Sequence, residues 1–303
     1  MNRHDFKERP HIDDVWDTFD FKVVMCGMGD DTAMLIAELF YRGMEPDELV
    51  FCDTGSEFPH TYSFIEFLQK WSDGKKWSKV VTLKKLNKFK KPLSVISLCK
   101  DQSTLPNAAF GEKTCSLRFK TETADLYFNN HKKCWDAWGV DRKGTKTSSH
   151  TGKILRMIGI NSDEPRRVKS WSNQPKWTQV FPLFDWGVGD FESNNVEKVG
   201  LYYPGKSSCT VCPNMTHSEI AMLRDNYPEI YKQSLEIEEA YRRKSLVKSK
   251  TDDLFGGDSY DNSVLGLGGI KGKTWPQMMQ EYDANPRRYK RMTSSMICNE
   301  CGH

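Results

Sequence analysis

The fold is decided by the stretch Phe21-Lys-Val-Val-Met-Cys-Gly-Met-Gly-Asp-Asp-Thr-Ala-Met-Leu-Ile-Ala-Glu-Leu-Phe40. Its first five residues predict a short buried strand, because they are mostly apolar and include two β-branched valines. Two glycines then predict a tight loop, and the apolar run from Ala33 to Phe40 predicts a helix. A strand, a glycine loop and a helix in this order are typical of parallel sheets that bind ligands at the carboxyl ends of their strands.

The same alternation continues on the C-terminal side of this stretch. Strands are predicted at residues 49–52 and 79–83, with a helix between them that begins at Pro59, and a later strand is predicted at residues 155–160. Strands that alternate with helices at this spacing favour parallel pairing with right-handed crossovers. We therefore expect a doubly wound, mostly parallel α/β sheet.

Beyond residue 180 the composition changes. Residues 181–212 are rich in Pro, Gly, Trp and Tyr, and residues 217–243 have the apolar spacing of a helix. Residues 244–273 are rich in Gly, Ser, Asp and Lys and have no sustained period. The sequence therefore predicts an α/β domain over residues 1–180, then a smaller helical region over residues 181–303 with a flexible loop near residues 244–273.

Composition restricts the class of partner. The 303 residues have a formal net charge of only +3, so the chain as a whole does not indicate a nucleic-acid or membrane partner. Five lysines cluster between residues 84 and 91, which gives nucleic acid weak support, although such a run is more often a solvated face. No apolar stretch approaches the roughly 18 residues needed to cross a bilayer, and the charged N-terminus is unlike a secretory signal. We expect a cytoplasmic protein with no membrane partner.

Polar groups follow the first two predicted strands. Residues 26–32 bring glycine amides, a helix N-terminus and the Thr32 hydroxyl to a position where a phosphate would bind, or else form a tight turn in which an aspartate only caps the helix. This loop has neither the G-x-G-x-x-G spacing of dinucleotide sites nor a G-K-[ST] ending. After the second strand, Asp53, Thr54 and Glu57 are available to a ribose, a phosphate or magnesium, or again to a helix cap.

Two further segments, residues 113–120 and 161–167, carry charged side chains suited to an anion. The candidate anion partners are Arg118, Lys120, Arg166 and Arg167. Asp163 and Glu164 are candidates for binding a metal or for holding the arginines. Surface salt bridges are the alternative for each of these side chains.

The nine cysteines form the last pattern. In a reducing compartment they are better interpreted as core residues, metal ligands or reactive thiols than as disulfides. Cys209 with Cys212, and Cys298 with Cys301, are two C-x-x-C pairs, each of which offers two thiolates to one ion. The pairs are far apart in the sequence, so a shared site requires the fold to bring them together.

In order along the chain, these segments resemble the phosphoadenosine phosphosulfate reductase-like family of the adenine-nucleotide alpha-hydrolase superfamily. Residues 27–32 are similar to its PP-loop in the variant G-x-G-x-D-[ST], and residues 53–62 to its D-T-G-x-E-x-P-x-T-Y segment. Residues 115–120 are similar to a C-[ST]-x-x-x-K motif, and residues 159–167 and 204–213 to later segments of the family. One departure is that the usual S-G-G-x-D-S loop would have Ser at residue 27 and Gly at residue 28.

The resemblance implies a doubly wound sheet with an adenine nucleotide over the PP-loop, either phosphoadenosine phosphosulfate or ATP with magnesium. It assigns nucleotide binding to Gly27, Met28, Gly29, Asp31, Thr32, Asp53, Thr54, Gly55, Glu57, Arg118, Gly159, Asp163, Glu164 and Arg166. It assigns the reaction to Asp31, Lys120, Arg167 and Cys301.

The resemblance also bears on the metal. Relatives with a four-iron four-sulfur cluster use a Cys-Cys pair and a C-x-x-C pair, and here Cys115 alone stands where the first pair would be. We therefore expect a cluster or a zinc ion to be bound by Cys209 and Cys212 with two thiolates drawn from Cys115, Cys298 and Cys301.

Three functions remain open, and the reductase-like assignment leads because it fits the sequence resemblance best. In a reductase, a thiolate attacks the nucleotide sulfate and a thioredoxin-like thiol then releases sulfite; the Glu-Cys-Gly-His ending resembles the family's E-C-G-[LI]-H tail and would make Cys301 the nucleophile. In an adenylating enzyme, similar to the family's sulfur-transfer and nucleic-acid-modifying relatives, the α-phosphate of ATP is attacked and pyrophosphate leaves, with Asp31 and Asp53 serving magnesium. In a non-catalytic nucleotide-sensing or zinc-stabilised module, both sites are structural. The C-x-x-C spacing favours Cys301 as a ligand over Cys301 as a nucleophile.

Overall fold

The structure is a computed structural model that describes residues 9–106, 115–140, 154–169, 176–253, 266–268 and 272–293. The chain divides into two compact units. The first comprises Met1–Cys52, Pro59–Leu83 and Glu122–Ser207, and the second comprises Asp53–Phe58, Lys84–Thr121 and Ser208–His303. This division follows contacts in space and not position in the sequence. It does not test the domain boundary expected at residue 180, which stays a prediction.

Helices alternate with strands through the first half of the chain. In chain order the elements are α1 (Ile12–Val15), η2 (Trp16–Thr18), β1 (Phe21–Cys26), α2 (Asp30–Tyr41), β2 (Glu48–Asp53), α3 (Pro59–Lys75), β3 (Lys79–Lys84), α4 (Val95–Gln102), η3 (Ser116–Thr121), α5 (Glu122–Asn129), α6 (Lys132–Trp138), β4 (Ile154–Ile158), α7 (Pro165–Lys169), β5 (Thr178–Val180), α8 (Pro182–Asp185), α9 (Asn195–Lys198), α10 (His217–Asn226), α11 (Pro228–Asp253), α12 (Trp275–Ala284) and α13 (Pro286–Thr293). The four strands predicted from the sequence are β1 to β4, and the helix predicted from Pro59 is α3.

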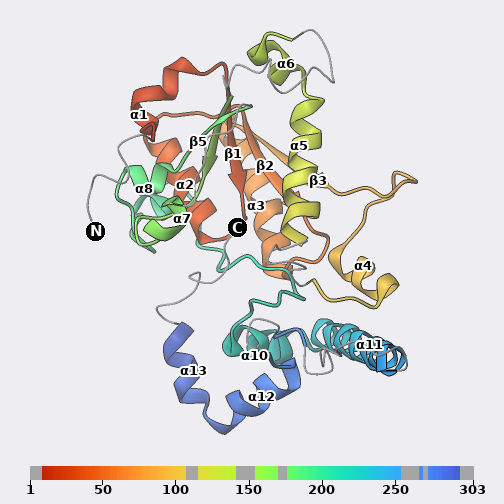
Figure 1. Cartoon of the computed structure of the whole chain (residues 1–303). Helices are drawn as coiled ribbons and strands as arrows, with labels where there is room; N and C mark the ends of the chain where they lie inside the picture. The colour runs from red at the N-terminus through yellow and green to blue at the C-terminus, as the bar shows by residue number, and fades with distance from the viewer. Residues whose placement is uncertain are drawn as a thin grey trace. The chain divides into compact units, whose positions relative to one another are not determined.

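The five strands form one all-parallel sheet in the order β3-β2-β1-β4-β5 (Figure 1). Register places Val24 of β1 beside Leu49 of β2 on one side and beside Met157 of β4 on the other. The expectation of a doubly wound α/β sheet is confirmed. Because β1 connects outward to β2 while β4 and β5 lie on its other side, the strand order reverses between β1 and β4.

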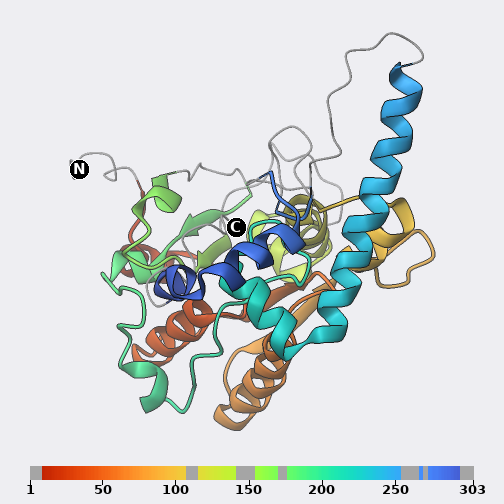
Figure 2. The same cartoon turned by 90° about the horizontal axis from the view of Figure 1, so that it is seen from below.

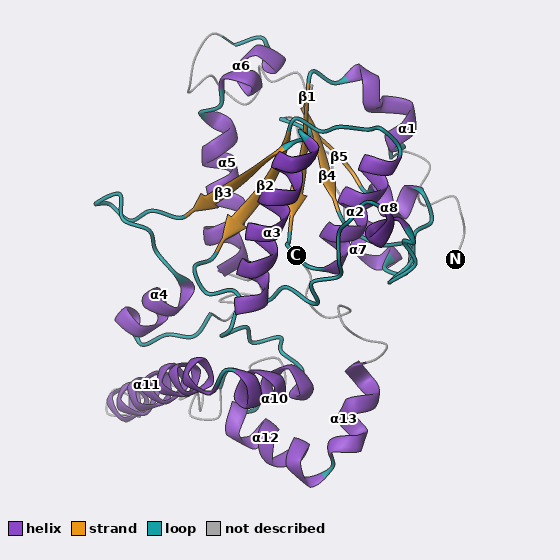
Figure 3. Ribbon diagram, turned by 180° about the vertical axis from the view of Figure 1, so that it is seen from behind, coloured by secondary structure: helices purple, strands orange, loops and turns teal. Residues whose placement is uncertain are grey.

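Helices cover both faces of this sheet (Figure 3). On one face, side chains of α2, α3, α8 and α9 pack on alternate strand residues such as Val24, Leu49 and Leu155. On the other face, α5 and α6 pack on residues of opposite parity such as Val23 and Val50. Strands buried on both sides are continuous apolar runs, which is the pattern that the sequence has at β1 and β2.

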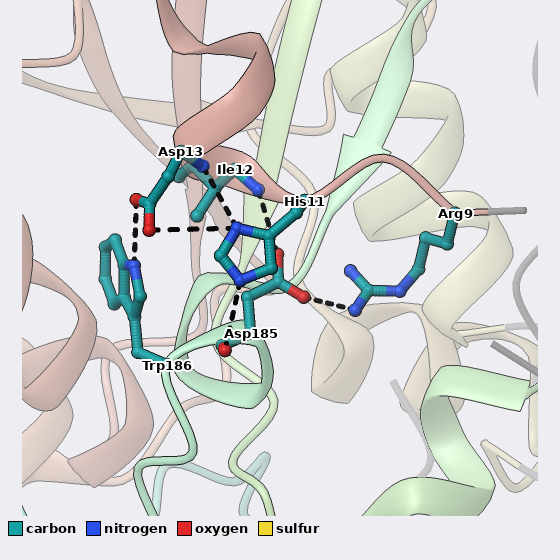
Figure 4. A network of polar contacts seen from close by, with 6 residues as sticks. All are labelled: Arg9, His11, Ile12, Asp13, Asp185 and Trp186. Atoms are coloured by element: carbon teal, nitrogen blue, oxygen red, sulfur yellow. Dashed lines mark hydrogen bonds and ion pairs between the residues drawn. The ribbon is translucent and has the colours of Figure 1, made fainter. Parts of the chain in front are cut away.

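The residues before α1 are tied to α8 through Asp185 (Figure 4). The side chain of Asp185 is buried, and it accepts hydrogen bonds from the Arg9 guanidinium and from the Ile12 amide, the latter at 3.1 Å. The ring nitrogen Nε2 of His11 lies 3.2 Å from the Asp185 carbonyl oxygen. The arm is therefore held by one buried carboxylate, which satisfies an amide in the first turn of α1.

The second unit is mainly helical. Apolar side chains of α4, α10, α11 and α12 share a core that also contains Phe58 and Phe119. Figure 2 shows the long helix α11, which α10 directly precedes in the chain. The two replace the single helix expected over residues 217–243, because Pro228 has no amide hydrogen to donate and begins a new helix after Tyr227.

The structure corrects the start of the predicted flexible loop. Helix α11 continues through Asp253, beyond residue 244, where the sequence predicts the loop to begin. Ser, Lys and Leu continue a helix at little cost when no Gly or Pro intervenes, and the first Gly of this segment comes only at residue 256. Residues 254–265 and 269–271 lie outside the described residues.

Candidate functional site

The candidate site in the first unit lies where the strand order reverses. β1 ends at Cys26 and β4 ends at Ile158, and the two strands are hydrogen-bonded neighbours. The loops that follow them, residues 26–32 and 159–167, therefore start side by side at the carboxyl edge of the sheet. In open parallel sheets this crevice is the usual ligand-binding position.

Residues 26–32, which we call the glycine loop, are held by Thr32. Its Oγ1 accepts hydrogen bonds from the Gly27 and Met28 amides, both at 3.0 Å. The glycine amides of this loop are predicted to bind a phosphate, but the Gly27 and Met28 amides donate instead to the threonine of the same loop. The hydroxyl keeps its proton as a donor for a ligand.

Met28 stands where the family's usual loop has glycine. Its φ is +62°, in the left-handed region, and its side chain is fully buried in the core beneath the sheet face that carries α2. A non-glycine residue in this region costs about 1 kcal/mol. Burial of the methionine side chain offsets that cost by about 2 kcal/mol.

A second loop, residues 204–207, lies against the glycine loop. A Cβ added to Gly29 would come 3.0 Å from the Ser207 nitrogen and 3.3 Å from the Gly205 carbonyl oxygen. The Gly205 amide donates to Oδ1 of Asp30 at 2.8 Å, and His60 Nε2 lies 2.9 Å from the Lys206 carbonyl oxygen. Burial raises the pKa of Asp30, and the Gly205 amide opposes that shift.

Asp30, His60, Lys206 and Ser207 are the residues that sequence reasoning missed as parts of this site. The segment Pro204-Gly-Lys-Ser was matched to the family but its side chains were given no role. A Gly-Lys-Ser sequence combines a flexible backbone with a cation and a hydroxyl. That combination is typical of phosphate-binding loops and could have identified this segment as part of the site.

Gly159 and Asp31 join the two strand-end loops. A Cβ at residue 159 would lie 2.9 Å from the Asp31 carbonyl oxygen, so only glycine fits. Nδ2 of Asn161 donates to Oδ1 of Asp31 at 3.4 Å. Burial, together with the negative charge of Glu164, raises the pKa of Asp31 to about 7, against the opposing charge of Arg167.

Residues 161–167, which we call the acidic loop, form an ion pair at their centre. The Arg167 guanidinium binds Oε2 of Glu164. The other oxygen, Oε1 of Glu164, is buried and has no hydrogen-bond partner in the described part of the chain. Asp163 is exposed and accepts a hydrogen bond from the Asp190 amide at 2.8 Å, while Arg166 is exposed. Of the predicted residues here, Glu164 and Arg167 are therefore grouped around Asp31.

The second unit holds the other predicted nucleotide-binding residues. Oδ1 of Asp53 accepts from the Gly55 amide at 2.7 Å, and its Oδ2 lies 3.4 Å from Nζ of Lys84. The Thr54 hydroxyl donates to Oε1 of Glu57 at 2.8 Å. Burial raises the pKa of Glu57, and the positive charge of Lys120 opposes that shift. Lys120 is thus a neighbour of Glu57, whereas Arg118 is exposed.

Gly55 has a conformational role in this segment. Its φ is +68°, and a Cβ there would lie 2.7 Å from the Cβ of Ser94, which caps α4. Glycine is required on both counts. The family motif D-T-G is therefore explained at this position by packing against the start of α4.

The first C-x-x-C turn, residues 209–212, is hydrogen-bonded to residues 56–58. The Thr210 amide donates to the Ser56 carbonyl oxygen at 2.7 Å, and the Phe58 amide donates to the Ser208 carbonyl oxygen at 3.0 Å. Glu57 and Cys209 face each other in an antiparallel bridge. Backbone hydrogen bonds therefore hold the cysteine turn against residues 56–58.

The Cys209 thiol of this turn lies in an environment that disfavours its thiolate form. Burial raises the pKa of Cys209, Glu57 and Cys115 raise it further, and the Val211 amide, which hydrogen-bonds to the sulfur, lowers it. The Cys212 amide donates to the Cys209 carbonyl oxygen at 3.0 Å, which closes the turn. Cys115 therefore lies close enough to Cys209 for their charges to interact.

A complete metal centre is not formed within the described residues. The described residues contain no group of three or more His, Cys, Asp or Glu side chains arranged to hold a metal ion. Cys298 and Cys301, which complete the predicted ligand set, lie outside them. The predicted metal centre and the role of Cys301 stay predictions. None of the seven cysteines of the described part is joined in a disulfide.

No family model matches the chain, and no curated protein matches it. None of the helices in the described part is both long and apolar enough to span a membrane.

Proposed function

We propose that the chain is an enzyme of the phosphoadenosine phosphosulfate reductase-like group that binds an adenine nucleotide with its phosphates at residues 27–32. The observation that carries the proposal is the close approach of Gly159 to Asp31 at the reversal of strand order. This approach joins the glycine loop to the acidic loop at the carboxyl edge of the sheet, where open parallel sheets usually bind their ligands.

The groups around the glycine loop suit a phosphate. The first amides of α2, at Asp30 and Asp31, have no partners within the helix and carry its partial positive charge. Lys206 and Ser207 add a cation and a hydroxyl in the loop that packs on Gly29. Ser207 thus brings a hydroxyl close to Gly29 at the start of α2, and Lys206 adjoins it in the sequence.

The carboxylates of this crevice favour ATP with magnesium over a sulfonucleotide alone. Asp30, Asp31, Glu164 and Asp190 repel one another, as the causes of the raised pKa of Asp31 indicate. An unaccompanied polyanionic nucleotide would add to that repulsion, whereas Mg²⁺ would relieve it.

Magnesium fits the donor set. Oε1 of Glu164 is a buried oxygen without a partner in the described residues, and a divalent cation would satisfy it. Mg²⁺ is commonly held by one or two carboxylates, several waters and the phosphates of its nucleotide, so Asp31 and Glu164 suffice without a third protein ligand. When bound, the ion would neutralise the charge of the phosphates. Arg167 would hold Glu164 in position through their ion pair.

The reaction favoured by these carboxylates is attack on the α-phosphate of ATP, which forms an adenylate and releases pyrophosphate. Sulfonucleotide reduction is the second candidate, because the Glu-Cys-Gly-His ending of the chain resembles the tail of such reductases. In that reaction a thiolate takes the sulfo group from the nucleotide, and a thioredoxin-like thiol releases it as sulfite.

One assay separates the candidates. Pure protein is incubated with ATP and magnesium, and separately with phosphoadenosine phosphosulfate and a thioredoxin-like reductant, and pyrophosphate, AMP and sulfite are measured. Pyrophosphate with ATP supports the adenylating enzyme, and sulfite with the sulfonucleotide supports the reductase. If nucleotide binds and none of these products forms, the chain is a binding module, and the absence of any nucleotide binding contradicts the proposal.

Asp31 provides the matched variant. The structure makes Gly29 the N-cap of α2, without a side-chain cap hydrogen bond, so Asp31 lies in the first turn and does not cap the helix. We expect Asp31→Ala to abolish turnover while costing only about 1 kcal/mol of folding stability. Asp31→Asn keeps the size of the side chain and its hydrogen bond with Asn161 but loses the charge, so it separates the hydrogen bond from the metal role. Unchanged nucleotide binding and turnover in folded Asp31→Ala protein would overturn the proposal.

The cysteine centre is proposed alongside the nucleotide site. Burial raises the pKa of Cys209, and the Val211 amide, which hydrogen-bonds to the sulfur, opposes that shift only in part, so a thiolate at this position needs a bound cation; Cys115 lies near it. We propose Cys209 and Cys212 as ligands of a four-iron four-sulfur cluster or zinc, completed by two of Cys115, Cys298 and Cys301.

A further inference from the structure

Residues 84–92, which we call the lysine hairpin, form an ordered turn between β3 and α4. The side-chain oxygen Oδ1 of Asn87 accepts hydrogen bonds from the Phe89 amide at 2.8 Å and from the Lys91 amide at 3.0 Å. The Asn87 amide donates back to the Lys91 carbonyl oxygen at 2.9 Å, and Leu86 and Pro92 form an antiparallel bridge. One asparagine therefore fixes the shape of the tip, so the tip keeps its shape without a partner.

The tip presents an aromatic ring among lysines. Phe89 is 70% exposed and Leu86 is 50% exposed, although burying a phenylalanine is worth about 2 kcal/mol. Nζ of Lys88 lies 5.0 Å from the centre of the Phe89 ring. The exposed lysines of the hairpin are Lys84, Lys88, Lys90 and Lys91. Ring and cations are thus held together on one small protrusion.

We propose that the lysine hairpin binds single-stranded nucleic acid, with a base stacked on Phe89 and phosphates bound by the flanking lysines. Aromatic rings interleaved with cations are the common chemistry of such sites, because every base has a face to stack and every nucleotide has a phosphate. A paired base is already stacked in its duplex, so the ring selects an unpaired strand.

Further cations lie beside the hairpin in the second unit. α4 packs against α11, and Nζ of Lys244 donates to the Gln102 carbonyl oxygen at 2.6 Å. Exposed Lys100 on α4, and Arg242 and Arg243 on α11, add positive charge to these two helices (Figures 1 and 2). Arg243 is paired with Glu239 on the same helix, so Lys100 and Arg242 are the cations here that add to the charge of the hairpin.

An anionic membrane is the competing partner for a ring among lysines, and the hairpin geometry disfavours it. Lys88 and Lys90 flank Phe89 directly in sequence, and Asn87 locks the backbone between them. The ring cannot enter the acyl region without drawing two ammonium groups toward it, which is costly. Stacking on a base needs only one face of the ring and leaves the ammonium groups at the phosphates.

The test measures binding of a fluorescein-labelled oligothymidylate of about 12 nucleotides to the full chain by fluorescence anisotropy. We expect binding that weakens between about 50 mM and 200 mM salt. Phe89→Ala should weaken binding by roughly five-fold to a hundred-fold, the range measured for stacking contacts. Lys90→Ala should lower the slope of log affinity against log salt by about 0.7.

Tyr41→Ala is the matched control. Tyr41 is also an exposed aromatic, at 63%, with Nζ of Lys198 lying 5.8 Å from its ring centre, but it belongs to the first unit. The Tyr41→Ala variant should therefore bind the oligonucleotide as tightly as the unaltered protein does. Undetectable binding by the unaltered protein, or equal binding by Phe89→Ala and Tyr41→Ala, would overturn the proposal. So would binding to phosphatidylserine vesicles that depends on Phe89 while oligonucleotide binding does not.

Discussion

Gly159, at the end of β4, approaches Asp31, in the first turn of α2, so closely that a Cβ at residue 159 would lie 2.9 Å from the Asp31 carbonyl oxygen. The contact is between backbones, and real Cβ atoms do not come this close to a backbone oxygen. A side chain at residue 159 would therefore push α2 away from β4 and open the crevice between the two loops.

We expect Gly159→Ala to lower the free energy of unfolding by about 1–3 kcal/mol and to weaken ATP binding at least ten-fold, since the glycine loop would shift. Urea denaturation and equilibrium nucleotide binding measure the two effects. Gly74→Ala is the control, because a Cβ at residue 74 meets nothing within 4 Å. In the helix α3 that alanine should be neutral or stabilising. Normal nucleotide binding by Gly159→Ala would contradict the assigned crevice.

Asp30 should hold residues 204–207 in contact with the glycine loop. We expect Asp30→Ala to weaken nucleotide binding, because the Gly205 amide loses its acceptor and residues 204–207 are released from the glycine loop. Asp30→Asn keeps an oxygen acceptor without the charge and should bind nucleotide nearly as well as the unaltered protein. Equal losses in the two variants would show that the charge of Asp30 matters rather than its hydrogen bond.

Cysteine variants should separate ligands from core residues. We expect Cys209→Ser and Cys212→Ser to reduce bound iron or zinc to a small fraction of its content in the unaltered protein, because removing a thiolate ligand weakens the whole site. Metal is measured by elemental analysis after anaerobic purification. Cys134→Ser, at a buried position on α6, should keep its metal even if it is less stable. Protein purified with neither iron nor zinc contradicts the proposed centre.

The tail cysteine has its own expected outcome. If Cys301 is a ligand, Cys301→Ser lowers metal content, and no sulfonated Cys301 accumulates when sulfonucleotide is added without reductant. Mass spectrometry of the intact protein checks this. Sulfonation at Cys301 with metal content unchanged would instead establish a nucleophile and the reductase reaction.

Stability should depend on pH through Glu238. This buried carboxylate accepts hydrogen bonds from the Leu267 amide at 2.5 Å and from the Trp275 amide, at the start of α12, at 3.1 Å. Burial raises the pKa of Glu238 in the folded state above its value in the unfolded chain, against the opposing effect of those two amides. The folded state therefore binds this proton more readily, and the contribution to stability is greatest below the unfolded pKa and is lost as pH rises through the folded pKa.

We expect Glu238→Gln to remove this part of the pH dependence and to be at least as stable as the unaltered protein near pH 7, because it keeps an acceptor without a buried charge. Glu238→Ala should cost about 1–3 kcal/mol at every pH, since both amides lose their acceptor. Urea unfolding between about pH 4 and pH 8 distinguishes the variants. Parallel stability profiles for Glu238→Gln and the unaltered protein would exclude Glu238 as the source.

The elements around the site could be predicted from the sequence because their signals are local. The apolar residues of β1, the glycines at 27 and 29, and the helical period from Ala33 all lie within one short stretch. The same holds for Pro59 at the start of α3. The predicted end of the helix at residue 243 was wrong, because α11 continues through Asp253. Lys and Ser in residues 244–253 carry no helix-ending signal, and composition alone suggested a loop.

The sequence by itself determined the alternation of strands and helices and the polar loops at the ends of β1, β2 and β4. Only the tertiary structure decided that Gly159 meets Asp31, that Ser207 packs on Gly29, and that Gly55 packs on Ser94. Strands buried on both faces have no polar side to specify their neighbours, so local periodicity cannot give the order β3-β2-β1-β4-β5. That order comes from burying both faces of the sheet at once, and it is what brings loops more than a hundred residues apart to the same edge.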